Sequence, residues 1–286
     1  MSLRAAVLGH PISHSKSPVL HQAAYERLGI GISYTAIDVT KDLLPAVMRQ
    51  IRDQQGWCGL SVTMPLKTAI LHEVDEVRGV ARTLGVVNTV SFEDHHGTPR
   101  AIGSNTDVTG IVNALRHAGT GTAPSAVILG GGSTAASAVA ALHELGASQV
   151  TVFVRDTSRA GDVHAAARSL GVDLDVRPLT EAARPTACAD VVISTLPPRA
   201  ADGLAAEIAA LKTATSGVLL DVAYDPWPSL AASVWQAGGG AVVPGLEMLL
   251  YQAVEQVRLF SRRGDNVDAA VIDVMCASVG LPRRAL

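Results

Sequence analysis

The stretch Ala126-Val-Ile-Leu-Gly130-Gly131-Gly132-Ser133-Thr134-Ala135 decides the fold of this chain. Its four leading apolar residues predict a short buried strand, and the alanine-rich run that continues to Leu145 predicts a helix. In a G-x-G-x-x-A turn the first glycine allows the tight bend, the second lets the backbone approach a pyrophosphate, and the alanine allows close helix–strand packing. The free N–H groups of the helix then face the phosphates. The stretch therefore predicts dinucleotide binding, although an ordinary tight turn would use the same glycines.

The next predicted strand, Gln149–Val154, bears on which dinucleotide is bound. Arg155 and Arg159 follow it, where the loop would meet the adenosine ribose, and two guanidinium groups suit a 2′-phosphate. Asp156 lies between them and could instead serve as the acid that binds the ribose 2′-OH of NAD. The arginines favour NADP, and NAD stays the alternative.

Short β-rich runs alternate with helical stretches along the whole chain, which predicts an α/β protein with largely parallel sheets. Two domains are expected: residues 1–106 joined by C-terminal helices over residues 246–286, and a Rossmann-type dinucleotide-binding domain with a parallel sheet over residues 107–245. Predicted strands are 3–8, 33–38, 59–63, 126–129, 149–154, 191–194 and 218–222, and predicted helices are 18–28, 42–52, 109–118, 134–145, 245–262 and 267–279. A hairpin is expected around the polar turn 93–100.

Composition excludes several classes of protein. The chain has 286 residues, of which 48% are hydrophobic and 17% charged, which is a globular balance. The formal charge of −3 gives no basic footprint for nucleic acid or an anionic membrane, and no apolar run approaches the ~20 residues of a membrane span. Three distant cysteines without a C-x-x-C pattern predict reduced thiols in a cytoplasmic protein and no metal site.

A second candidate site lies near the N-terminus, in Gly9-His-Pro-Ile-Ser-His-Ser15-Lys-Ser17-Pro18. Ser17 followed by Pro18 predicts the N-cap and first residue of a helix. The hydroxyls of Ser15 and Ser17 would then lie beside free N–H groups at the positive end of that helix, which suits a small carboxylate. An ordinary capped helix is the alternative.

Further motifs follow in a fixed order: Ser61-Val-Thr63-Met-Pro65-Leu-Lys67, Asn88-Thr89, Asn105-Thr106-Asp107-Val-Thr-Gly110, Asp221-x-x-Tyr224-x-Pro226 and Gly245-Leu-Glu-Met248-Leu-Leu-Tyr-Gln252. Together with the serine motif and the glycine loop, they closely resemble the shikimate dehydrogenase family over nearly the whole chain. The resemblance implies a two-domain reductase that interconverts 3-dehydroshikimate and shikimate with NADPH or NADP in the biosynthesis of aromatic amino acids.

The resemblance also implies residue roles. Lys67 and Asp107 match the catalytic pair, and Ser15 and Ser17 match the hydroxyls that hold the substrate carboxylate. The remaining substrate positions are Ser61, Thr63, Asn88, Tyr224 and Gln252, and the cofactor positions are Gly130, Gly131, Gly132, Ser133, Thr134, Arg155, Arg159, Thr195, Val222 and Gly245. An ammonium such as that of Lys67 can protonate and stabilise the alkoxide that forms when hydride reaches a ketone. Asp107 would orient it.

Two departures from the family pattern keep alternatives open. Ser61 stands where the family has asparagine, which predicts a shortened contact to the ring or one mediated by water, and Asp156 follows the ribose-loop arginine. A quinate/shikimate or aminoshikimate dehydrogenase using NAD is the close alternative. A catalytically silent dinucleotide-binding protein is the remote one, since a fold alone does not specify function. The expected partner is the small-molecule substrate, in a monomer or homodimer.

Overall fold

The structure is a computed structural model that describes residues 3–96, 98–262 and 266–284. The chain divides into two compact units: unit 1 comprises Met1–Thr106 and Leu249–Leu286, and unit 2 comprises Asp107–Met248. The second break falls inside a helix, a few residues beyond the expected boundary at 245/246. In the part of the chain that the structure describes, each unit contains one six-stranded sheet.

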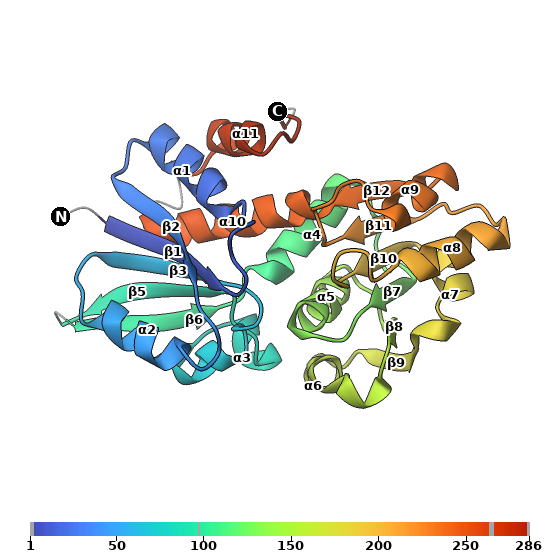
Figure 1. Cartoon of the computed structure of the whole chain (residues 1–286), viewed down its shortest axis with the longest axis horizontal. Coiled ribbons are helices and arrows are strands. Elements are labelled where there is room, and N and C mark those ends of the chain that lie inside the picture. Colours follow the sequence, from blue (N-terminus) through green and yellow to red (C-terminus); the bar gives the residue numbers. More distant parts are fainter. Residues whose placement is uncertain (1–2, 97, 263–265, 285–286) are drawn as a thin grey trace. The chain divides into compact units, whose positions relative to one another are not determined.

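Unit 1 is built on a mixed sheet with the order β2-β1-β3-β5-β6-β4 (Figure 1). The first three strands in the chain are mutually parallel, whereas β5 runs antiparallel to both β3 and β6. Its elements are β1 (Leu3–Gly9), α1 (Ser17–Leu28), β2 (Ile32–Asp38), α2 (Leu44–Arg52), β3 (Trp57–Val62), β4 (Glu76–Val77), α3 (Val80–Leu84), β5 (Thr89–His95), β6 (Thr98–Ser104), part of α10 (Gly245–Ser261) and α11 (Ala269–Ser278), with a 3₁₀ turn at Ala69–His72.

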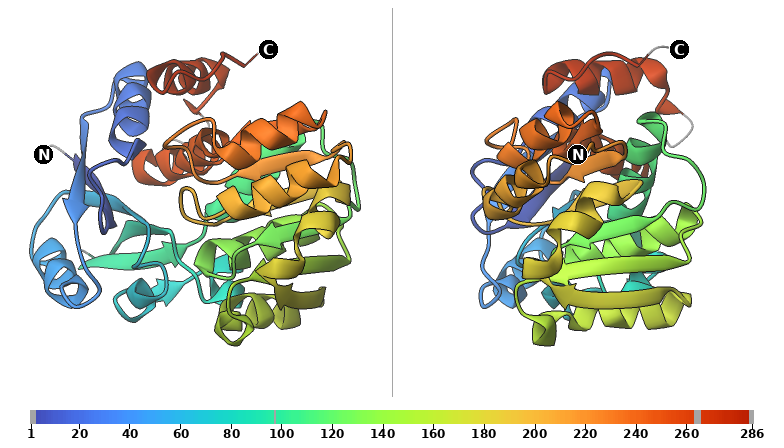
Figure 2. Two further views of the ribbon diagram at one scale, coloured as in Figure 1. Left: turned by 45° about the vertical axis from the view of Figure 1, so that its right-hand side comes forward. Right: turned by 90° about the vertical axis from the view of Figure 1, so that its right-hand side faces the viewer.

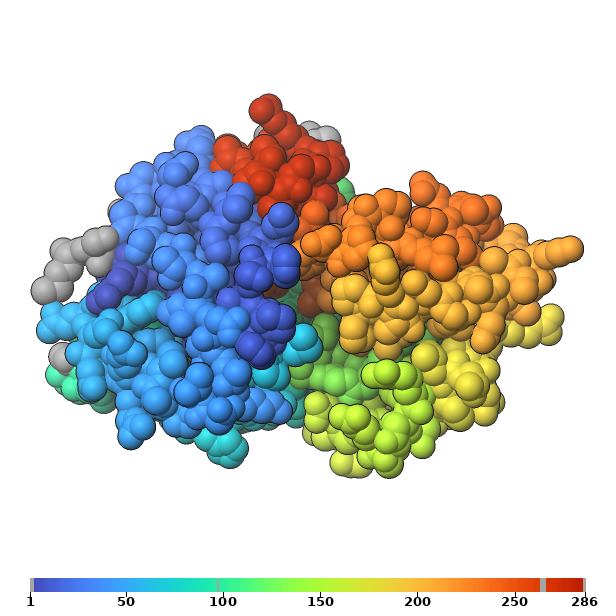
Figure 3. All heavy atoms as spheres, viewed as in Figure 1, coloured from blue at the N-terminus to red at the C-terminus, as the bar shows by residue number. Residues whose placement is uncertain are grey.

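Each face of this sheet has its own apolar core. Successive side chains of a strand point to opposite faces, and β1 follows the rule: Ala5 and Val7 join one cluster, Ala6 and Leu8 the other. The first cluster is completed by α1, α10 and α11, and the second by α2 and the 3₁₀ turn. The atoms of α11, red, adjoin the blue atoms of α1 in Figure 3, in agreement with the packing of these two helices. The last helix of the chain thus packs on the first.

Unit 2 has a fully parallel sheet with the order β12-β11-β10-β7-β8-β9. The order reverses at β7, which pairs with both β8 and β10, and ligands of such sheets bind at the carboxyl ends of the strands at this point. Its elements are α4 (Asp107–His117), β7 (Ala126–Leu129), α5 (Ser133–Glu144), β8 (Gln149–Val154), α6 (Gly161–Leu170), β9 (Asp173–Pro178), α7 (Ala183–Cys188), β10 (Val191–Ser194), α8 (Asp202–Leu211), β11 (Val218–Asp221), α9 (Leu230–Ala237), β12 (Ala241–Pro244) and the start of α10, with 3₁₀ turns at Thr157–Arg159 and Leu179–Glu181.

Helices cover both faces of the parallel sheet (Figure 2). On one side α5 packs against α4, α6 and β7, and on the other α8 packs against α7 and α9. Alanine has the highest helix propensity and a side chain small enough for close packing. The alanine-rich α5 is buried on every side between Ala135 and Leu142, which brings its first turn close to the end of β7.

The sequence placed most strands and helices within two or three residues but differed from the structure in several details. The hairpin strands β5 and β6 extend further into the polar turn than expected, and Gly97 at its tip lies outside the described residues. Lys16, not Ser17, is the N-cap residue of α1, so the expected cap was wrong by one position. The elements β4, α3, β9, α6, α7, α8, α9 and β12 had not been expected individually.

Among the described helices, none combines the length and apolar character needed to cross a membrane. All three cysteines are free thiols: Cys58 and Cys276 are buried, and Cys188 is exposed.

Candidate active site

The glycine loop between β7 and α5 is shaped by one close contact and one open position. Gly130 has φ +107°, which a side chain rarely tolerates, and a Cβ there would lie 2.4 Å from Oγ1 of Thr195. That Oγ1 donates to the carbonyl of Leu129 at 3.0 Å. Thr195, predicted at the cofactor site, therefore packs directly on the first glycine. Gly132, the N-cap of α5, has no atom within 4 Å of where a Cβ would be, so its surface is open for a ligand to approach.

The ribose loop after β8 lies beside the same glycine loop. A Cβ on Gly131 would be 2.8 Å from Cγ1 of Val154 and 3.7 Å from Cα of Ala160, the two buried residues that flank the loop. Arg155 and Arg159 are exposed between them. The structure thus brings both arginines to the edge of the sheet where the glycine turn lies.

The third group of predicted cofactor residues, Val222 and Gly245, lies where β11 has just ended and where α10 begins. A Cβ on Gly245 would lie 2.1 Å from the carbonyl oxygen of Val222. Only glycine allows α10 to begin this close to the backbone that follows β11. Tyr224 lies two residues further on and is half-buried.

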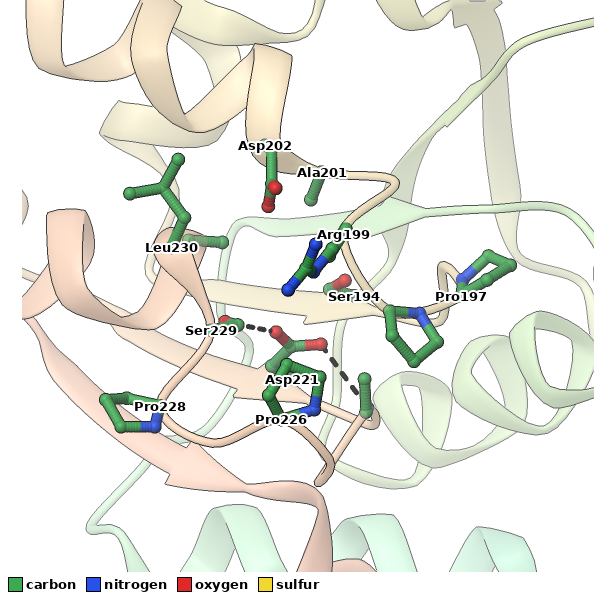
Figure 4. Close-up of a pocket in the computed structure, with 13 residues that line it drawn as sticks. Ser194, Pro197, Arg199, Ala201, Asp202, Asp221, Pro226, Pro228, Ser229 and Leu230 are labelled. Atoms are coloured by element: carbon green, nitrogen blue, oxygen red, sulfur yellow. Dashed lines mark hydrogen bonds between the residues drawn. The ribbon is translucent and has the colours of Figure 1, made fainter.

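A cavity of about 250 Å³ opens at the carboxyl ends of β10 and β11 (Figure 4). Ser194 and Asp221, the last residues of these strands, line it with Arg199 and Ser229. Oγ of Ser229 donates to Oδ2 of Asp221 at 2.7 Å and also caps α9 by accepting from the N–H of Ala232. Burial raises the pKa of Asp221, and the Ser229 hydrogen bond opposes that shift. The Asp221 carboxyl, at the end of β11, therefore holds the N-cap residue of α9 in place.

The predicted substrate residues of unit 1 gather at one edge of its sheet. Ser15 and Ser17 follow β1, Thr63 and Lys67 follow β3, and Asn88 precedes the antiparallel β5, so all five occupy the same end. The Ser15 hydroxyl accepts a hydrogen bond from the N–H of Ser17 at 3.3 Å. It thus satisfies a free donor at the start of α1, the role expected for Ser17.

Asn88 is held by several hydrogen bonds. Its Oδ1 accepts from the backbone N–H of Thr106 at 2.7 Å and from Oγ1 of Thr89 at 2.8 Å. Because an N–H can only donate, this fixes the orientation of the amide and leaves Nδ2 as the donor. Nδ2 donates to Oγ1 of Thr106 at 3.0 Å and to Oε1 of Gln252 at 3.4 Å. Two predicted substrate residues, Asn88 and Gln252, are therefore in direct contact.

Gln256, one helical turn after Gln252, links the residues around Asn88 to Ser61 and His21. Its Nε2 donates to Oγ1 of Thr89 at 2.9 Å and to the carbonyl of Asn88 at 3.3 Å, so Oε1 is the acceptor. That oxygen accepts from Oγ of Ser61 at 2.6 Å and faces Nε2 of His21 at 3.2 Å. The Ser61 hydroxyl in turn accepts from the hydroxyl of Tyr34, also at 2.6 Å.

The orientation of the Gln256 amide also determines which ring nitrogen of His21 carries the hydrogen. Its Nε2 carries the hydrogen, because Oε1 of Gln256 can only accept, and its Nδ1 accepts from the hydroxyl of Tyr25 at 3.0 Å. Burial lowers the pKa of His21 to about 3, with the Gln256 hydrogen bond opposing the shift. The ring is neutral and stacks on Tyr34 at a centroid distance of 4.0 Å.

Sequence reasoning missed Gln256, Tyr34 and Thr89 as members of this network. The available signal was a second glutamine four residues after Gln252, since residues four apart share one helix face. Buried polar groups need partners, and these residues provide them.

The two predicted catalytic residues are both buried. Lys67 is 8% exposed and Asp107 is 4% exposed. Lysine and aspartate are almost never this buried unless they are paired. Lys67 accepts a hydrogen bond at its carbonyl from the N–H of Val87, and Asp107 begins α4 directly after Thr106 of the Asn88 network. Both are therefore in fixed backbone positions.

A dinucleotide fits the residues of unit 2. The open surface at Gly132, the start of α5 and the exposed arginine pair provide a close backbone approach, N–H donors and positive charge for a pyrophosphate and a 2′-phosphate. Among the described residues, no cluster of His, Cys, Asp or Glu could hold a metal ion.

Comparison with known proteins agrees with this division of the chain. Residues 7–90 match the model of the shikimate dehydrogenase substrate binding domain, and residues 113–223 match that of shikimate / quinate 5-dehydrogenase. A shikimate dehydrogenase (NADP(+)) of Rubrobacter xylanophilus is 35% identical over 269 residues, 92% of each chain.

Two solved structures extend the likeness to three dimensions. The crystal structure of Mycobacterium tuberculosis shikimate dehydrogenase has a TM-score of 0.83 and 36% identity, covering 98% of this chain and 100% of that one. The Thermus thermophilus shikimate 5-dehydrogenase, solved in complex with NADP(H) and shikimate, has a TM-score of 0.78 and 31% identity, covering 96% and 99%. The fold and the matches define this chain as a two-domain α/β dehydrogenase. This chain belongs to the shikimate dehydrogenase family.

Proposed function

We propose that this chain is an NADP-dependent shikimate dehydrogenase, which reversibly reduces 3-dehydroshikimate to shikimate in the biosynthesis of aromatic amino acids. The observation that carries the proposal is the presence of the family's motifs, in order, in a chain that is 35% identical to a shikimate dehydrogenase (NADP(+)) over 92% of its length. The buried polar network around Asn88 and Gln252 supports it, because such a network suits the hydroxyl groups of a polyhydroxylated ring.

In this proposal unit 1 supplies most of the residues that bind the substrate, and unit 2 supplies Tyr224 and the residues that bind the cofactor. Ser15 and Ser17 bind the substrate carboxylate, while Ser61, Thr63, Asn88, Tyr224 and Gln252 bind its hydroxyl groups. In unit 2 the pyrophosphate lies on Gly130, Gly131, Gly132, Ser133 and Thr134, the 2′-phosphate on Arg155 and Arg159, and the nicotinamide side against Thr195, Val222 and Gly245.

The reaction requires a proton at the carbonyl oxygen of the substrate. NADPH supplies the hydride when bound, and the chain supplies position and electrostatics. Lys67 donates the proton to the oxygen that becomes an alkoxide and stabilises its charge before transfer. Asp107 orients the ammonium of Lys67 for this transfer. In the reverse direction Lys67, once deprotonated, accepts the hydroxyl proton.

The test is to follow nicotinamide absorbance with purified protein, combining shikimate and quinate with NADP and NAD. The expected result is turnover with shikimate and NADP. Turnover with quinate and NAD would instead assign the chain to the quinate branch of the family, and binding without turnover on any pair would identify a silent dinucleotide-binding protein. Gel filtration during purification distinguishes the proposed monomer from the homodimer. A cytoplasmic location is also proposed.

A further inference from the structure

The acid in the ribose loop lies within a short turn that is anchored at both ends. Val154 and Ala160 are buried against Gly131, and the five residues between them are exposed. Within this span lies the 3₁₀ turn Thr157–Arg159, whose N-cap residue is Asp156. The direction of the arginine side chains therefore depends on how this turn is closed.

Asp156 closes the turn. Its Oδ1 accepts from the backbone N–H of Ser158 at 3.0 Å and from the Ser158 hydroxyl at 2.6 Å. Its carbonyl accepts from the N–H of Arg159 at 3.1 Å. The hydrogen bonds from Ser158 lower the pKa of Asp156, and the charge of Arg159 adds to that effect. One residue thus contacts both the turn and the backbone of the second arginine.

An acid that binds a ribose 2′-OH needs its carboxylate directed at the ribose. Oδ1 of Asp156 is instead bonded twice within its own turn, as in the local side chain–backbone bonds that aspartate favours at caps. The loop has two guanidinium groups against one carboxylate, and this balance favours a phosphate over a hydroxyl.

We propose that Asp156 is a positioning residue that, through Ser158, fixes the turn presenting Arg155 and Arg159 to the 2′-phosphate of a dinucleotide. It selects NADP by arranging the arginines, and it does not bind the ribose 2′-OH. This inference rests on the proposed function, because it requires that unit 2 bind a dinucleotide.

The test compares three variants in binding rather than turnover. Asp156→Asn keeps an acceptor oxygen for Ser158 and removes the charge, Asp156→Ala removes the cap, and Ser158→Ala removes the hydroxyl donor. The dissociation constant of NADPH is measured by its fluorescence, and those of 2′,5′-ADP and 5′-ADP by calorimetry. Asp175→Asn, on the exposed surface of β9, controls for the loss of a negative charge.

Removal of the cap should weaken binding of NADPH and of 2′,5′-ADP by about fivefold, with 5′-ADP unchanged, as expected from the loss of one capping interaction. Asp156→Asn should bind both at least as tightly as the wild type, because the repulsion between carboxylate and phosphate is gone. Ser158→Ala should show a smaller loss, of about twofold. Asp175→Asn should change none of them. The rescue by asparagine separates positioning from a merely structural role.

Two results would overturn the inference. One is that Asp156→Ala binds 2′,5′-ADP as the wild type does. The other is that Asp156→Asn weakens binding of 5′-ADP, which has a free ribose 2′-OH, because that loss would identify the carboxylate as the 2′-OH acid. If either occurs while the wild type still oxidises shikimate with NADP, the inference fails alone. If the wild type binds neither NADPH nor 2′,5′-ADP, the inference and the proposed function fail together. Should Asp156→Ala not fold, the asparagine and Ser158 variants give the same decision.

Discussion

The two units form their candidate sites from different chemical groups. In unit 2 the site is mostly backbone: Gly130, Gly132 and Gly245 create close approaches and open surfaces, and the start of α5 supplies N–H groups. In unit 1 it is mostly side chains, and the hydrogen bond between Asn88 and Gln252 joins residues 164 positions apart. Substitutions in the site of unit 2 should therefore weaken cofactor binding. Substitutions in the site of unit 1 should lower the turnover rate or the free energy of unfolding.

The largest effect is expected from Lys67→Ala in unit 1. Turnover should fall by about a thousandfold, as expected for loss of a general acid, while the affinity for shikimate changes little. Steady-state kinetics and shikimate calorimetry provide the measurement, and Lys41→Ala, on the exposed surface of the same unit, is the control. A rate close to that of the wild type would refute the role of Lys67.

Gly130→Ala tests the backbone site of unit 2. The backbone at this position has φ +107°, which alanine rarely adopts, and the added Cβ would clash with Oγ1 of Thr195. NADPH binding should therefore weaken by about a hundredfold, or roughly 3 kcal/mol. Shikimate binding should be retained. Gly203→Ala in α8, where a Cβ meets nothing within 4 Å, should leave NADPH binding unchanged. Equal loss in both variants would show that the glycine loop has no special requirement.

Gln256→Leu tests the buried network of unit 1. The change leaves Ser61, Thr89 and His21 without their shared partner, so the free energy of unfolding should fall by about 2 kcal/mol. Thermal or urea unfolding measures it, with Gln236→Leu on the exposed face of α9 as the control. If both variants are equally stable, the network contributes nothing to unit 1.

A further prediction is a pH dependence of stability from His21. The folded ring has its pKa lowered to about 3, whereas the unfolded chain takes up the proton near pH 6.5. The stabilisation is complete above pH 6.5 and decreases toward pH 3, by at most about 1.4 kcal/mol for each pH unit. Unfolding measured from pH 7.5 to 5 should show this slope in the wild type and less of it in His21→Gln. The exposed His72→Gln should behave as the wild type.

The same contrast explains what could be predicted from the sequence. The strand–glycine–helix pattern of β7 and α5 is local, so the parallel sheet and the dinucleotide site followed from a few consecutive residues. Gln256, Tyr34 and Ser61 meet only after the chain has folded, and no local pattern indicates their contact. Ser61 had been expected to leave a shortened or water-mediated contact to the ring. In the structure its hydroxyl bonds to Tyr34 and Gln256, and the sequence alone could not show these contacts.

The division of the chain has a consequence for its synthesis. Unit 2 lies entirely within residues 107–248, whereas the core of unit 1 needs Leu250, Val254 and Phe260 from α10 and Met275 from α11. A ribosome releases these residues after unit 2, and domains generally fold as units as they emerge. Unit 2 can therefore fold while synthesis continues, but the earlier part of unit 1 must wait for α10 and α11. Until then the face of sheet β2-β1-β3 that α10 later covers is open to chaperones and to premature association.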